Sequence, residues 1–151
     1  MNGYRFIPIA PIVIGGILFL FLSFCACTSN QSPGKPENDI DAARDFIRSA
    51  LDGKFDEART YLLPDSSNIQ YMDAAERSYR KTDADTKNGY RGSSINIHKV
   101  EPVNDSTTIV IFSNSFKNDH DTLKVLKVND EWLIDLKYLY EHDMDTTRYY
   151  K

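Results

Sequence analysis

The sequence predicts an α+β domain in which N-terminal helices pack on one face of a curved, antiparallel, four-stranded sheet. Two observations predict this class. Apolar residues recur every three or four positions up to about residue 81, and they alternate with polar residues from about residue 95 onward. The alternating segments are separated by short gaps rich in Asn and Asp, which is typical of hairpins. Helices followed by consecutive antiparallel strands form the α+β layout.

Two helices are expected at the start of the domain. The first begins near Asp39, whose carboxylate is placed to cap it, and ends near Gly53. The second is short and covers about residues 55–63, because Pro64 cannot continue it.

A third helix is expected over about residues 66–81. Glu76 and Arg80 are four residues apart in it and should form an exposed ion pair. The following segment, residues 82–94, contains Asn88-Gly89 and few apolar residues, so it is predicted to be a turn.

Four strands complete the domain. In the last of them Trp132, Ile134 and Leu136 share one face, which is expected to meet the helices. Asp135 is out of phase with them and is therefore expected to be a solvated residue on the opposite face. The predicted strands are residues 95–102, 107–116, 122–128 and 131–139.

Three segments resemble known packing motifs. They are AARDF at 42–46, ALDGKFDEA at 50–58 and VNDEWLI at 128–134. Together they look like the nuclear-transport-factor-two-like, or cystatin-like, domains, and more narrowly like small bacterial lipoproteins of unknown function that carry such a domain. The resemblance covers about residues 39–140. It implies a cone of sheet around the helices, whose open end is a ligand pocket, an active site or neither.

The N-terminus has the anatomy of an export signal. Arg5 precedes the apolar run 6–24, and the small residue Ala26 stands directly before Cys27. This order predicts a lipoprotein signal peptide over residues 1–26, with cleavage and lipidation at Cys27. A cut before Cys25 is an alternative. The other is an uncleaved membrane anchor, because the run approaches the length of a spanning helix.

The predicted signal peptide determines where the other segments of the chain are expected to lie. A flexible linker over residues 27–38 should join the acylated Cys27 to a domain at 39–140, followed by a tail at 141–151. The acyl chains would hold the protein to the membrane of the cell envelope. Thr28, rather than Asp, follows the cysteine, which favours the outer membrane with the domain facing the periplasm.

Composition excludes several kinds of chemistry. The formal net charge is −4, and an acidic chain is a poor ligand for nucleic acid. Both cysteines, Cys25 and Cys27, lie in the signal region, so the domain has no thiol for catalysis, metal binding or redox exchange. No glycine-rich phosphate loop or serine-hydrolase motif is present, and no cofactor is expected.

The candidate ligand pocket is aromatic. The resemblance also implies an alternative, acid–base chemistry next to a carbonyl, which would need a buried Asp or His near tyrosine hydroxyls. Asp135 is the candidate, although its strand phase argues against burial. The tyrosines that would surround it are Tyr61, Tyr71, Tyr79 and Tyr138. The residues predicted to line a ligand pocket are Tyr61, Tyr79, Trp132 and Tyr138.

Two clusters contain typical metal ligands. Asp119-His120-Asp121 falls in a predicted hairpin turn, and Glu141-His142-Asp143-Met144-Asp145 follows the last strand. Neither has three or four donors fixed on rigid elements, so no metal site is predicted. His98 is expected on the exposed side of the first strand.

These observations favour a lipid-anchored envelope protein whose domain binds a small molecule or another envelope protein without catalysis. An enzyme that uses the interior of the cone is the first alternative. The second is a structural subunit of an envelope assembly that pairs through an apolar patch of Leu133, Leu139 and Val110.

Overall fold

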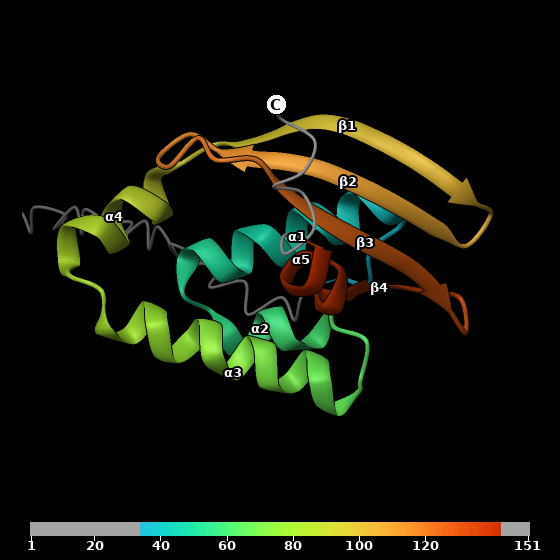
Figure 1. The fold of residues 1–151 in the computed structure, drawn as a ribbon, viewed down its shortest axis with the longest axis horizontal. Helices are drawn as coiled ribbons and strands as arrows, with labels where there is room; N and C mark the ends of the chain where they lie inside the picture. The colour runs from blue at the N-terminus through green and yellow to red at the C-terminus, as the bar shows by residue number, and fades with distance from the viewer. Residues whose placement is uncertain (1–33, 143–151) are drawn as a thin grey trace, which may run out of the picture. The chain divides into compact units, whose positions relative to one another are not determined.

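The computed structural model describes residues 34–142, and helices precede a four-stranded antiparallel sheet of order β1-β2-β3-β4 (Figure 1). The α+β class is therefore confirmed. The sheet is open rather than closed into a barrel. The elements are α1 (Asp39–Asp52), α2 (Phe55–Thr60), α3 (Ser66–Lys81), α4 (Ala84–Gly92), β1 (Ile95–Asn104), β2 (Thr107–Asn114), β3 (Asp121–Val128), β4 (Glu131–Asp135) and α5 (Leu136–His142).

Several sequence predictions lie outside the described residues. They are the signal peptide, Cys27 with most of the linker, and residues 143–151 of the predicted tail. Within residues 34–142, none of the helices has the length and hydropathy needed to span a bilayer.

Helix α1 is capped one residue earlier than predicted. The side-chain oxygen of Asn38, not that of Asp39, accepts a hydrogen bond from the backbone N–H of Asp41 at 2.9 Å. The Asp39 carboxylate instead accepts from the Thr108 hydroxyl at 2.5 Å, which ties the start of α1 to β2. The predicted end is confirmed, because Gly53 closes α1 with a φ of 76°.

Helix α2 is shorter than predicted and ends at Thr60. The next residues leave the helix to pair with the sheet. The Leu63 N–H donates to the Ile134 carbonyl at 2.9 Å, and the Ile134 N–H donates to the Tyr61 carbonyl at 2.8 Å. These bonds cover part of the outer edge of β4, which would otherwise be open for pairing.

Helix α3 matches its predicted limits. The carboxylate of Asp65 caps it by accepting from the Asn68 N–H at 2.9 Å. The predicted pair of Glu76 and Arg80 is present. Arg59 of α2 also binds Glu76, so the ion pair belongs to a network that fastens α2 to α3.

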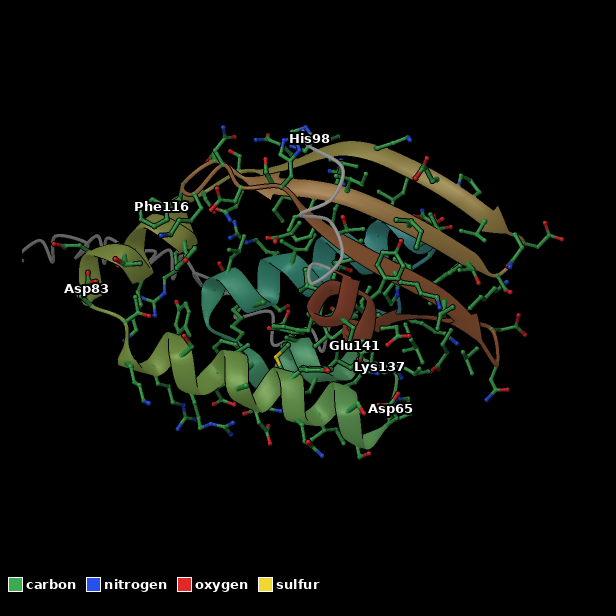
Figure 2. All side chains as sticks on the ribbon, in the orientation of Figure 1. Asp65, Asp83, His98, Phe116, Lys137 and Glu141 are labelled. Atoms are coloured by element: carbon green, nitrogen blue, oxygen red, sulfur yellow. The ribbon has the colours of Figure 1, made fainter. Side chains whose placement is uncertain are left out.

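The turn predicted over residues 82–94 is wrong, because most of this segment forms α4. Asp83 caps the helix by accepting from both the N–H and the hydroxyl of Thr86, each at 2.8 Å. Gly89 lies inside the helix, where the ring of Phe116 covers it. Figure 2 shows Phe116 beside α4. A Cβ at position 89 would stand 2.4 Å from that ring, so the glycine permits a close contact rather than a turn.

One face of the sheet packs on α1 and forms the core. Val110 lies opposite Leu123, and Val125 lies opposite Ile134, and all four are fully buried. Asn129 and Asp130 connect β3 to β4 with φ values of 50° and 63°, as two-residue hairpin turns require. The helices contribute these buried residues to the core: Ala42, Ala43, Phe46, Ile47, Phe55, Ala58, Met72 and Leu136.

The fourth predicted strand is wrong beyond Asp135, where α5 begins. Asp135 accepts from the Lys137 N–H at 3.2 Å, and the side-chain oxygen of Asn68 accepts from the Leu136 N–H at 2.6 Å. Leu136 and Leu139 are three residues apart, which places both toward the core on a helix but not on a strand.

The predicted outer patch is also wrong. Val110 is fully buried in the core, and Leu139 packs against the core from α5. Leu133 pairs with Leu126 on the opposite face of the sheet. The three residues therefore share no surface.

Candidate ligand pocket

A pocket of about 340 Å³ opens between α1, α3, α5 and the adjoining ends of β2 and β3. The walls of this pocket are formed by helices and strands that also pack in the hydrophobic core. The apolar wall residues are Phe46, Ile47, Ala50, Leu51, Phe55, Met72, Ala75, Phe112, Leu123, Leu136 and Leu139.

A second hollow of about 460 Å³ adjoins the first and extends toward α4. It adds Tyr79 and Ser78 of α3 to the lining. The two hollows share a wall and are called the cleft from here on. The shared residues are Ala50, Leu51, Phe55, Ala75, Tyr90 and Tyr140.

A chain of aromatic contacts builds the side of the cleft near α4. The rings of Phe55 and Tyr79 meet edge to face at 5.3 Å between centroids, and Tyr79 lies 6.3 Å from Tyr90. Tyr90 in turn meets Phe116 edge to face at 5.2 Å. The ring of Phe116 therefore holds α4 against the β2–β3 loop.

The charged residues of the cleft lie at its mouth, on the β2–β3 loop and at the start of β3. Asn114 shapes this loop, because its side-chain oxygen accepts from the N–H groups of Phe116 and Lys117 at 3.2 and 2.9 Å. Lys117, Asp119 and Asp121 line the mouth beside it.

Tyr140 of α5 faces the mouth from the other side. Its ring stacks on that of Tyr71 at 4.7 Å, and the Tyr71 hydroxyl donates to Glu141 at 3.0 Å. Loss of hydration, followed by the negative charge of Asp121, raises the pKa of Tyr140. Its hydroxyl therefore stays protonated and remains a hydrogen-bond donor at neutral pH.

The four residues predicted to line one pocket are dispersed. Tyr79 lines the cleft, and Tyr61 is buried in the core. Trp132 packs against the core at the far end of β4, with the Lys127 ammonium 5.7 Å from its ring. Tyr138 lines a separate hollow of about 370 Å³.

Sequence reasoning missed most of the residues that line the cleft. Tyr140 was placed directly after the predicted fourth strand, and Tyr90 in a predicted turn. The spacing of Leu136, Leu139 and Tyr140 at three and four residues was the available signal for α5.

The prediction that Asp135 is solvated is wrong. Asp135 is only 6% exposed, although it lies on the face of β4 opposite the one that carries Ile134. The Asn68 amide lies 3.5 Å and the Lys137 ammonium 3.4 Å from its carboxylate. Asp135 and Asn68 thus belong to a polar cluster that joins α3 to α5, outside the cleft.

His98 of β1 and His120 of the β2–β3 loop lie close together. His98 is exposed, as predicted (Figure 2). Its ring stacks on that of His120 at 4.1 Å between centroids. The Nε2 of His98 is 2.8 Å from the hydroxyl of Ser113. Among residues 34–142, no three His, Cys, Asp or Glu side chains converge as metal ligands.

Comparison with known proteins identified no relative of the chain. No protein family, curated protein or solved structure matches the chain significantly.

Proposed function

We propose that the protein is a lipid-anchored component of the cell envelope whose α+β domain binds a small molecule in the cleft, without catalysing a reaction. The observation that carries the proposal is the cleft itself. The domain is proposed to be of the cystatin-like type, with the cleft at the open end of its cone.

The cleft has the properties of a small-molecule site. Such sites usually have volumes of about 300–1,000 Å³, mainly apolar walls and a few polar groups that orient the ligand. The two hollows, of about 340 and 460 Å³, fall in this range. Phe46, Phe55 and Met72 supply apolar walls, and the β2–β3 loop supplies the polar groups.

Binding is favoured over catalysis by the position of the buried carboxylate. A general acid or base must reach the substrate from inside the site. Asp135 lies outside the cleft, in the separate hollow that Tyr138 also lines, and its Oδ1 contacts Asn68 and Lys137. The charged side chains of the cleft stand at the mouth instead.

The proposed anchor is Cys27, acylated after removal of residues 1–26. The linker would let the domain stand clear of the outer membrane on its periplasmic side. The proposed anchor is supported by the order of Arg5, the apolar run 6–24 and Ala26 before Cys27.

Intact mass tests the anchor. In membrane-extracted protein we expect the loss of residues 1–26 and the added mass of acyl chains, and we expect neither in a Cys27→Ala variant. An unprocessed mass in both proteins would instead mean that the apolar run is a retained anchor.

Thermal unfolding with a library of apolar and amphipathic compounds tests the cleft. A cognate ligand at a hundredfold excess over its Kd should add about 2.7 kcal/mol to the stability of the folded state. Ala75→Phe should abolish this gain, because residue 75 lines both hollows.

The matched control is Ala84→Phe, since Ala84 is exposed on α4 and lines neither hollow. A ligand that stabilises the Ala75→Phe variant as much as the wild type would show that it binds elsewhere.

A further inference from the structure

We propose that the end of the domain formed by the β1–β2 and β3–β4 turns docks on the lipid surface, so that the cleft opens away from the membrane. This end consists of residues 103–107 and 127–131 and is called the hairpin end. The inference rests on the membrane anchor of the proposed function. It specifies that the cleft takes its ligand from the aqueous phase.

The two turns form one continuous surface. The Lys127 N–H, near the end of β3, donates to the Ser106 carbonyl in the β1–β2 turn at 2.8 Å. Figure 1 shows both turns together at one end of the sheet, with α4 beyond the other end.

The chain enters the domain at the hairpin end. Lys35 pairs with Glu131 of the β3–β4 turn at 3.2 Å. Four residues later, Asp39 at the start of α1 accepts from Thr108, the second residue of β2. The N-terminal side of the domain is therefore fixed beside the two turns.

This entry point places the hairpin end nearest the proposed anchor. Cleavage before Cys27 and retention of the apolar run 6–24 would both attach the membrane on the N-terminal side of the domain. Residues 27–33 separate Cys27 from the described domain. Seven residues reach at most about 25 Å even when fully extended, so the hairpin end stays close to the lipid.

The hairpin end carries exposed apolar side chains that the core and the cleft do not use. Val103 is 63% exposed and Val128 is 37% exposed. Neither valine belongs to the core or lines the cleft. Next to them, Trp132 is half-buried, and membrane–water interfaces favour tryptophan. Contact with lipid would remove this apolar surface from water.

The charges of the hairpin end favour no charged lipid. Lys127 pairs with Asp130 at 3.5 Å, and Lys35 neutralises Glu131. Asp105 is the remaining charged residue of the two turns. Because there is no positive excess, anionic lipid would not attract this end, and apolar contact with zwitterionic lipid is the mode that fits it.

A contact through two valines is weak, and the linker allows the domain to leave the surface. The anchor compensates for this weakness, because a tethered domain meets the lipid at a high effective concentration. The docked state is therefore populated without a large interface.

Docking at the hairpin end sets the direction of the cleft. Strand β2 runs from Thr107 at the hairpin end to Asn114 at the mouth of the cleft. Eight residues of strand cover about 25 Å. The mouth would therefore stand up to that distance from the lipid and open to water.

Trp132 is a natural probe of this contact, because it is the only tryptophan of the chain and lies at the start of β4. The full chain is reconstituted through its own anchor in phosphatidylcholine vesicles, and flotation isolates the chain that the vesicles hold. Tryptophan emission is then compared between plain lipid and lipid with brominated acyl chains, which quench tryptophan on contact.

We expect the brominated lipid to remove most of the Trp132 emission. Val103→Asp combined with Val128→Asp should restore most of it, because charges would then stand in the apolar contact. The matched control combines Asn96→Asp with Asn118→Asp. Both residues are exposed, and they lie at the start of β1 and on the β2–β3 loop, away from the hairpin end, so quenching should not change.

A second control moves the tryptophan to the side of the cleft. Trp132→Phe combined with His120→Trp places it at an exposed position of the β2–β3 loop. Its emission should be insensitive to bromine.

The outcomes separate this inference from the anchor. No quenching of Trp132, equal quenching at both tryptophan positions, or quenching that survives both valine substitutions in full would overturn the docking, and flotation of the chain would leave the anchor standing. A chain that does not float with the vesicles would contradict the anchor itself, and the docking would fall with it.

Discussion

Asp65 combines two structural roles at one residue. It caps α3 and binds the Lys137 ammonium at 2.5 Å, which joins the start of α3 to α5 (Figure 2). The hydrogen bond from Lys137, followed by that from the Asn68 N–H, lowers the pKa of Asp65 to about 2. Its charge is thus more favourable in the folded chain than in the unfolded chain.

Asp65→Asn should lower stability at neutral pH but not at strongly acidic pH. Asparagine keeps the cap and removes the charge. Because the folded pKa is depressed, the stabilisation is complete above the ordinary value of 3.8 and is lost as the pH falls through about 2. Urea unfolding of both proteins across this range measures the difference, and a difference that does not change with pH would contradict the ionic explanation.

Both the backbone conformation and a close side-chain contact require glycine at position 53. Its φ is 76°, and a Cβ there would lie 2.7 Å from the ring of Tyr79. Gly53→Ala should destabilise the fold by about 1 kcal/mol for the left-handed conformation and further for the displaced ring.

Gly92→Ala is the matched control for this substitution. Gly92 ends α4, and a Cβ there would meet no other atom within 4 Å. Alanine should therefore be neutral or stabilising by up to about 1 kcal/mol. Equal losses in the two variants, measured by urea unfolding, would contradict the account of Gly53.

At the scale of elements, α4 depends on a few specific contacts. Asp83 caps its start, and Arg48 of α1 donates to the carbonyls of Ser93 and Tyr90 near its end, at 2.9 and 3.3 Å. Since α4 has no buried residue of its own, these contacts and Phe116 hold it in place.

Asp83→Ala should loosen α4 selectively. Loss of a helix cap costs about 1 kcal/mol, and amide hydrogen exchange should accelerate in α4 more than in α1 or the sheet. Asp85→Ala in the same turn, which removes an acidic residue without removing the cap, is the control. Uniform acceleration across the domain would mean that α4 is not separately stabilised.

The long elements were predictable from sequence, whereas α4 and α5 were not. Helix α3 has a strong period, and the strands alternate between turns of Asn and Asp. In α5 the period was ambiguous, because Ile134 and Leu136 fit a strand while Leu136 and Leu139 fit a helix. The contact of Asn68 with the Leu136 N–H favours the helix, and it joins residues that are 68 positions apart.

Only the aromatic character of the candidate site was predictable from the sequence. An aromatic pocket was expected, and Tyr79 does line the cleft. Tyr90 and Tyr140 were missed because α4 and α5 were missed. Tyr61 and Trp132 were misplaced, since aromatic residues fill cores as readily as they line pockets.

At the scale of the whole domain, the cleft brings together α1, α3, α4, α5 and the ends of β2 and β3. Helix α4, which has no buried residue of its own, carries Tyr90 at the border of the cleft, and α5 carries Tyr140. Ligand binding should therefore order these helices, and the stability gained on binding should reach the entire domain.

The most direct test is the methyl NMR signal of Met72, which lies in the cleft wall, during titration of the full chain with a ligand identified by thermal unfolding. The account predicts a saturable shift in the wild type and in Ala84→Phe, and none in Ala75→Phe, where the new ring fills the cleft. A saturable shift that survives Ala75→Phe unchanged, or no shift in the wild type, would contradict the claim that this cleft is the binding site.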